Sequence, residues 1–171
     1  MNNKSNKNPI WFYFVAILVS FSFIVLIEVG LRIFNYGNDY SLWIEKGNYL
    51  KLNPLIAKKY FKNTEAIPYP IPDLFEKIKS QNTIRIFVIG ESSAAGFPYS
   101  PNGTFSKYIR LKLEDEFPAN NIEVINLSMA AINSYTFLDF VKSLIEFEPD
   151  AILIYGGHNE YYGALGVGSS E

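Results

Sequence analysis

The sequence predicts an α/β protein built on a parallel β-sheet and preceded by a transmembrane helix. Three short apolar runs of the kind that form buried strands alternate with two stretches whose apolar residues recur at helical spacing. Strands that alternate with helices pair in parallel through right-handed crossovers. An 18-residue run without charge or proline near the N-terminus predicts the transmembrane helix.

The N-terminal part predicts a short polar tail over residues 1–9 and a single-pass membrane anchor over residues 10–34. At about 1.5 Å per residue, the apolar run at 10–27 is just long enough to cross the hydrocarbon core. Lys4 and Lys7 precede it, which favours a cytoplasmic N-terminus and an extracytoplasmic domain. A cleavable signal peptide is one alternative, but residues 28–32 contain no small-residue cleavage pattern. A buried core helix is the other alternative.

Residues 35–82 show no regular period and predict an irregular segment that packs against the domain or the membrane surface. Tyr, Phe, Ile and Leu remain frequent in it, so its composition is not that of a disordered linker. Residues 73–80 predict one short helix, because Pro72 suits a helix start.

Residues 83–171 predict the α/β domain, with strands over 84–90, 122–128 and 151–157 and helices over 104–117 and 134–147. Helical spacing assigns a set of apolar side chains to the faces that pack on the sheet: Phe105, Tyr108, Ile109, Leu113 and Phe117 in the first helix, and Leu138, Val141 and Ile145 in the second.

Small and polar residues follow each of the three predicted strands. Residues 90–93 read Gly-Glu-Ser-Ser, residues 126–131 read Asn-Leu-Ser-Met-Ala-Ala, and residues 156–160 read Gly-Gly-His-Asn-Glu. In open α/β sheets the loops that leave the carboxyl ends of the strands lie along one rim, and ligands bind there. The sequence therefore predicts that these three segments converge on one site.

The three segments, in this order and spacing, resemble the first three sequence blocks of the SGNH/GDSL hydrolases. This superfamily contains esterases, lipases and carbohydrate acyl hydrolases with a flavodoxin-like sheet. Its Gly-Asp-Ser block is matched by Gly90-Glu91-Ser92, and its Gly-x-Asn-Asp block by residues 157–160, which read Gly-His-Asn-Glu. The resemblance implies a three-layer α/β/α fold of the SGNH type.

The resemblance also implies that Ser92 is the nucleophile. The oxyanion hole would consist of the backbone N–H groups of Ser92 and Ala131 and the side-chain amide of Asn159. A serine just past a strand end can expose its hydroxyl and direct its N–H towards a developing oxyanion, as an amide side chain can without titrating. The structural alternative is that Ser92 only caps the start of a helix.

Three positions depart from the family pattern. Glu91 and Glu160 stand where the family usually has Asp, and we expect both to hold the supporting loops, with Gly90 and Gly157, by hydrogen bonds rather than to act as acid and base. Ala131 stands where the second block usually has Gly. A backbone donor survives this change as long as the loop does not require the left-handed region.

The family's last block, Asp-x-x-His, supplies the general base and its orienting carboxylate, and no such segment occurs in this sequence. A serine hydroxyl without an adjacent base is a weak nucleophile. The sequence therefore predicts the N-terminal part of a longer hydrolase. The single histidine, His158, is not where the family has its base, so we expect His158 and Tyr161 to contact substrate or to pack at the rim.

Composition narrows the function further. The absence of cysteine excludes disulfides, thiolate metal sites and a cysteine nucleophile, and the scattered basic residues argue against a nucleic-acid partner. The resemblance implies neither a metal nor a cofactor. We therefore expect a membrane-anchored hydrolase of acyl esters, with envelope glycans or lipids as substrates. The alternative is a non-catalytic binding module, or a decayed enzyme, that keeps the rim without the base.

Overall fold

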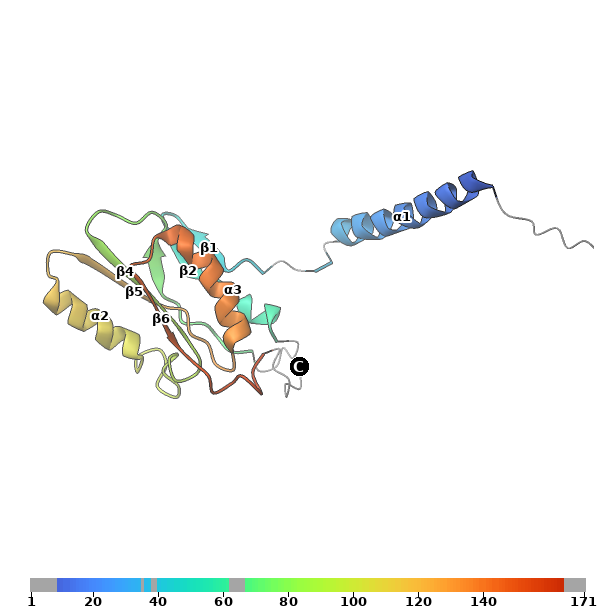
Figure 1. Ribbon diagram of the computed structural model, residues 1–171. Helices are drawn as coiled ribbons and strands as arrows, with labels where there is room; N and C mark the ends of the chain where they lie inside the picture. The colour runs from blue at the N-terminus through green and yellow to red at the C-terminus, as the bar shows by residue number, and fades with distance from the viewer. Residues whose placement is uncertain (1–8, 35, 38–39, 62–66, 165–171) are drawn as a thin grey trace, which may run out of the picture. The chain divides into compact units, whose positions relative to one another are not determined.

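The computed structural model describes residues 9–34, 36–37, 40–61 and 67–164, and the chain divides into two compact units, residues 1–39 and 40–171 (Figure 1). The first unit contains helix α1, Ile10–Ile33, in which no residue is buried. Its length and apolar composition are sufficient to cross a membrane, although a signal sequence would share both properties.

The second unit is a mixed α/β domain whose centre is a three-stranded parallel sheet. Strand β4 (Thr83–Gly90) lies in the middle, with β5 (Asn121–Asn126) on one side and β6 (Ala151–Tyr155) on the other. The ladder places Val88 of β4 opposite Asn126 of β5 and Leu153 of β6. The predicted strands and their parallel pairing are therefore confirmed.

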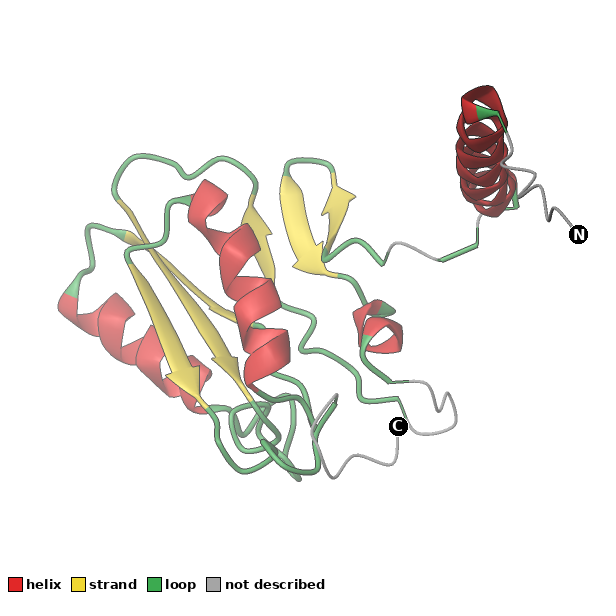
Figure 2. Cartoon of the chain, turned by 45° about the vertical axis from the view of Figure 1, so that its right-hand side comes forward, coloured by secondary structure: helices red, strands yellow, loops and turns green. Residues whose placement is uncertain are grey.

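Helices α2 (Phe105–Glu116) and α3 (Ser134–Leu144) cover opposite faces of this sheet, as Figures 1 and 2 show. Val88 packs with α2, whereas its neighbours Phe87 and Ile89 point to the other face and join the larger core beneath α3. A short 3₁₀ helix, η2 (Ile145–Phe147), continues α3.

The predicted inward faces of the helices are only partly correct. Phe105, Ile109 and Leu113 pack on the sheet, but Tyr108 and Phe117 are exposed. In α3 the error is larger, because Leu138 and Ile145 are exposed and Val141 is only partly buried, while the buried side chains are Thr136, Phe137, Phe140 and Leu144. This helix is apolar over more than one stripe, so spacing alone did not determine which stripe faces inward.

Residues 40–82 form more regular structure than the sequence predicts. Strands β1 (Trp43–Lys46), β2 (Tyr49–Leu52) and β3 (Leu74–Glu76) make an antiparallel sheet, and a 3₁₀ helix, η1 (Ile56–Lys59), follows β2. The helix predicted over 73–80 is wrong: residues 74–76 pair with β2 instead. Tertiary packing explains the difference, because Phe75 is buried against Trp43, Phe87 and Phe147.

A buried arginine ties the two sheets together at the amino ends of the parallel strands. Arg85 of β4 is fully buried, and its Nε lies 2.6 Å from Oε2 of Glu123 on β5. Its two terminal nitrogens donate to the carbonyls of Phe147 and Glu76, each at 2.9 Å. Every guanidinium nitrogen therefore has a partner, which a buried charge requires.

Candidate functional site

The carboxyl ends of all three parallel strands meet at one rim, and the three predicted segments leave from it. Figure 2 shows the loops gathered beyond the arrowheads of the strands. The chain runs from the central strand β4 to β5 on one side and then to β6 on the other, so the strand order reverses between β4 and β6. Ligands of open α/β sheets bind outside the strand ends at such a reversal. The loops that hold Ser92 and Asn159 leave β4 and β6 at this point.

The contact between these two strand ends is close. A side chain at Gly90 would place its Cβ 2.4 Å from the carbonyl oxygen of Tyr155 and 2.5 Å from Cβ of Ala94. Only glycine allows the chain to turn here while β4 and β6 stay paired. The segment after Gly90 therefore starts directly beside the end of β6.

Ser92 lies in a tight turn over residues 91–96 rather than at the start of a helix. The Ala95 N–H donates to the Glu91 carbonyl at 2.9 Å, and the Phe97 N–H donates to the Ser92 carbonyl at 2.9 Å. The next helix, α2, begins only at Phe105, so the interpretation of Ser92 as a helix cap is wrong. Ser92 is half-buried, and neither its hydroxyl nor its N–H makes a hydrogen bond within the described part of the chain.

Glu91 joins the Ser92 turn to the loop after β6. Its side chain is 2% exposed, and Oε1 accepts the N–H groups of Gly157 (2.8 Å) and Asn159 (3.2 Å). Oε2 accepts the N–H of His158 at 3.1 Å. Three charge-assisted hydrogen bonds to one buried carboxylate fix three successive residues of this loop against the turn.

Asn159 is held between the loop after β6 and the loop after β5. Its Nδ2 donates to the Ile132 carbonyl at 3.2 Å, which uses one of the two amide hydrogens. The Ala164 N–H donates to the Ala131 carbonyl at 3.0 Å, a second link between the same loops. The Ala131 N–H, like that of Ser92, has no acceptor among the described residues.

Ala131 adopts the left-handed backbone conformation, which is the case in which the sequence analysis expects the change from glycine to alanine to be unfavourable. Its φ is +58°, in the left-handed region, so the loop does require what a glycine would supply more easily. The donor remains a backbone N–H, but alanine holds it at a cost in conformational energy. The side chain of Ala131 is exposed, so no packing compensates.

Glu160 anchors the far end of the last loop to helix α3. Its Oε1 accepts the Ser134 N–H at 2.9 Å, and its Oε2 accepts the Ser134 hydroxyl at 2.6 Å. A carboxylate at a helix N-terminus also interacts favourably with the helix dipole. Both glutamates therefore make structural hydrogen bonds to the loops that carry the site.

Asn126 is a structural residue of the site that sequence reasoning did not single out. Its side chain is fully buried at the end of β5; Nδ2 donates to the Ala94 carbonyl (2.9 Å) and to the Ser106 hydroxyl (3.0 Å). Its Oδ1 accepts the Ser128 N–H at 2.9 Å. The feature of the sequence that could have indicated this role is a polar residue at the end of a mostly apolar strand.

His158 and several aromatic side chains surround this arrangement and are open to solvent. The His158 side chain is 70% exposed, with its Nδ1 3.4 Å from Oε2 of Glu91. Tyr161 and Tyr162 are exposed and meet edge to face, with ring centroids 4.8 Å apart. Tyr155, at the end of β6, is half-exposed.

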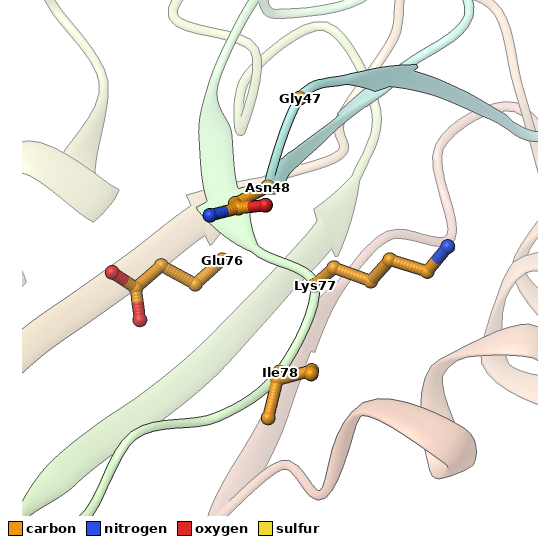
Figure 3. A pocket seen from close by; sticks show the side chains of 5 residues that line it. All are labelled: Gly47, Asn48, Glu76, Lys77 and Ile78. Atoms are coloured by element: carbon orange, nitrogen blue, oxygen red, sulfur yellow. The ribbon is translucent and has the colours of Figure 1, made fainter.

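A cavity of about 430 Å³ lies elsewhere, between the turn of the β1–β2 hairpin and the end of β3 (Figure 3). Asn48, Glu76 and Lys77 line it, and Lys77 is paired with Glu45 at 2.7 Å. Since the Glu76 carbonyl accepts a hydrogen bond from Arg85, near the start of β4, this cavity is at the opposite end of the sheet from Ser92. It contributes nothing to the rim.

No protein-family model, curated protein or solved structure matched this chain. Within the described ranges, no three His, Cys, Asp or Glu side chains are grouped so that they could hold a metal ion. The loops at the rim thus carry a serine hydroxyl, two backbone N–H groups without an acceptor among the described residues, and a positioned amide.

Proposed function

We propose that this protein is a serine ester hydrolase of the SGNH/GDSL type. Ser92 attacks the ester carbonyl, and the N–H groups of Ser92 and Ala131 together with the Asn159 amide stabilise the resulting oxyanion. The observation that carries the proposal is that neither backbone donor has an acceptor among the described residues and that both belong to loops that Glu91 and Asn159 bind together. Removal of one such donor typically lowers turnover by about 10²–10³-fold.

The topology supports the same proposal. Counted along the chain, β4 is the first strand of the parallel sheet, β5 the second and β6 the third, so the spatial order β5–β4–β6 is 2-1-3. A flavodoxin-like doubly wound sheet has the order 2-1-3-4-5, which starts with the same three strands. In such sheets the ligand lies at the reversal between the first and third strands, where Ser92 and Asn159 are found here. A flavodoxin-like SGNH fold is the architecture that we infer from this order.

The substrate proposal follows from the anchor. Helix α1 would hold the domain at the outer surface of a membrane, with the N-terminus in the cytoplasm, so O-acylated glycans or lipids of the envelope would be within reach. The exposed aromatic residues Tyr155, Tyr161 and Tyr162 offer flat apolar surface to an acyl chain or a sugar ring.

The test is covalent labelling of the full chain, in detergent micelles, with a fluorophosphonate probe followed by peptide mapping. We expect adduct at Ser92, no adduct in Ser92→Ala, and unchanged labelling in Ser93→Ala, the matched control one residue further on. If protein with a folded circular dichroism spectrum is not labelled, the base is not among the residues of this chain, and the labelling is repeated on protein that carries the predicted Asp-x-x-His block. No adduct there would refute the hydrolase proposal, and the rim would then belong to a non-catalytic binding module.

A further inference from the structure

The loops at the carboxyl end of the parallel sheet expose several large aromatic side chains. Single exposed apolar residues are common on proteins, but a group of them on one end of a domain is typical of a surface that contacts a partner or a membrane. The aromatic surface consists of five half-exposed or exposed residues from two loops: Phe97, Tyr99, Tyr155, Tyr161 and Tyr162. We propose that this aromatic surface contacts a lipid bilayer.

Hydrogen bonds hold the two aromatic residues that follow the Ser92 turn. The Phe97 N–H donates to the Ser92 carbonyl at 2.9 Å, and the Gly103 N–H donates to the Tyr99 carbonyl at 2.9 Å. The side chains of Phe97 and Tyr99 are nevertheless 73% and 77% exposed. Because exposure of apolar rings to water is unfavourable, a contact outside the domain would explain aromatic residues at these positions.

An aromatic contact connects the loop after β4 with the end of β6. Phe105, the first residue of α2, meets Tyr155 edge to face, with ring centroids 6.0 Å apart. Further along the loop after β6, the Gly163 N–H donates to the Asn159 carbonyl at 2.6 Å and closes the turn that contains Tyr161 and Tyr162. The two loops that form the aromatic surface therefore lie at the same end of the sheet.

The segments at this end of the sheet are nearly free of charge. Residues 92–106 and 127–138 contain no Lys, Arg, Asp, Glu or His, and residues 151–164 contain only His158 and Glu160. Both oxygens of the Glu160 carboxylate are bound at the start of α3. Contact of the aromatic surface with lipid therefore removes few charged groups from water, which keeps its desolvation cost low.

The opposite end of the sheet has a different character. There Lys77 pairs with Glu45 and Lys79 pairs with Asp150, each at 2.7 Å, and all four side chains are at least partly exposed. Burial of these pairs in a lipid surface would cost far more than burial of uncharged rings. The distribution of charge thus selects the end that carries Ser92 as the one that meets the bilayer.

The proposed anchor supplies the membrane. Helix α1 ends at Ile33 and the second unit begins at Tyr40, so a fully extended chain separates these residues by at most about 25 Å. With α1 in the bilayer, this short tether keeps the domain beside the lipid surface, and even weak apolar contacts then suffice for association. The inference rests on this anchor.

A glycan is the other partner that stacks on aromatic rings. A specific sugar site needs several convergent polar side chains that fix the orientation of its ligand, whereas the most exposed large side chains here are aromatic. The bilayer is therefore favoured. If Ser92 is the nucleophile, the same contact selects lipid esters over glycan esters as substrates, and this consequence rests on the proposed function.

The experiment measures quenching of a tryptophan in the full chain by phosphatidylcholine vesicles whose acyl chains carry bromine near the headgroup. The parent is Trp11→Phe, because Trp11 lies in α1, and Trp43 gives the same background in every variant. Phe97→Trp is the test variant. Ile78→Trp is the matched control, because Ile78 is 82% exposed and lines the cavity at the opposite end of the sheet (Figure 3).

The expected result follows from the depth of interfacial contact. Apolar side chains at a membrane surface lie about 5–10 Å into the headgroup boundary, so the emission added by Phe97→Trp should fall by about half or more in brominated vesicles. The emission added by Ile78→Trp should stay unchanged. Neither high salt nor the absence of anionic lipid should reduce the quenching, because the aromatic surface has no cationic side chain.

Three results would overturn the inference. Quenching of Phe97→Trp no greater than that of Ile78→Trp would mean that the aromatic surface faces water, where a glycan is the remaining partner. Quenching that requires anionic lipid would mean that charge, not apolar contact, brings the domain to the bilayer. Failure of the chain to float with the vesicles would remove the anchor and the inference with it. The proposed function is tested separately, because Ser92→Ala should lose fluorophosphonate labelling and keep the quenching.

Discussion

Replacement of Ala131 by glycine should stabilise the domain. Ala131 has φ of +58°, and an L-residue in the left-handed region is less favourable by about 1–2 kcal/mol. Glycine removes that strain, but it also gains freedom in the unfolded chain, which disfavours folding by about 0.5–1 kcal/mol. The net expectation for Ala131→Gly is a stabilisation of between about 0 and about 1.5 kcal/mol.

The neighbouring Ala130 provides a matched control, because it has no positive φ. Ala130→Gly gains the unfolded-state entropy without relieving strain, so it should destabilise the domain by about 0.5–1 kcal/mol. The difference between the two variants, about 1–2 kcal/mol, then measures the strain at Ala131 itself.

The assay is urea denaturation of the full chain in micelles, followed by the fluorescence of Trp43. This indole packs against Phe75 and Phe147 in the core. A Trp11→Phe background removes the signal of the other tryptophan, which lies in α1. If Ala131→Gly is destabilised as much as Ala130→Gly, the left-handed conformation of Ala131 is refuted. Labelling of Ser92 should persist in Ala131→Gly, because the proposed donor is the backbone N–H.

Three further predictions concern buried and partly buried charges. Arg85→Met should lower the free energy of unfolding by about 3–5 kcal/mol, because it leaves the largely buried Glu123 carboxylate without its cationic partner. Arg85→Met combined with Glu123→Leu should recover part of that loss in urea denaturation. Glu91→Gln should destabilise the domain by about 1–3 kcal/mol, because the glutamine amide offers one acceptor oxygen to three N–H donors. Labelling of Ser92 should also become slower in this variant. Labelling at the wild-type rate would contradict the role of Glu91 in positioning the loops. The hydrogen bond from Lys79, together with the hydrogen bond from the Arg85 N–H, lowers the pKa of Asp150 in the folded protein. The Asp150 carboxylate therefore stabilises the fold at pH values above its unfolded pKa of about 3.9, and this stabilisation is lost as the pH falls through the lower folded pKa. Thermal midpoints measured from pH 7 down to about pH 2 should therefore fall less in Asp150→Asn than in the wild type; an equal fall would contradict this reasoning.

The order of strands and helices in the α/β part could be predicted because its signals are local. The apolar runs that became β4, β5 and β6 end in small or polar residues, and each helix between them has enough apolar residues to cover one face. Alternation then forces parallel pairing and brings the three loops to one rim. The same logic correctly predicted that the loops of Ser92 and Asn159 leave strand ends at the same rim.

Features that depend on distant partners could not be predicted. Residues 74–76 carry no strand period, and they form β3 only because β2 provides the ladder and a core is available for Phe75. In α3, Leu138 and Phe137 are both apolar, and packing of the helix against the core on its face of the parallel sheet buries Phe137. Local periodicity contains no information about either partner.

The sequence by itself determined that an apolar helix precedes an α/β domain and that a serine, an amide and three loops share one rim. These properties follow from periodicity and from the geometry of parallel sheets, which act over a few residues. Only the tertiary structure decided that Glu91 binds the loop of Asn159 with both carboxylate oxygens, that His158 faces that carboxylate, and that Ala131 is left-handed. The reason is physical: hydrogen bonds across 66 to 68 residues and the φ of one loop residue depend on how packed elements close on one another.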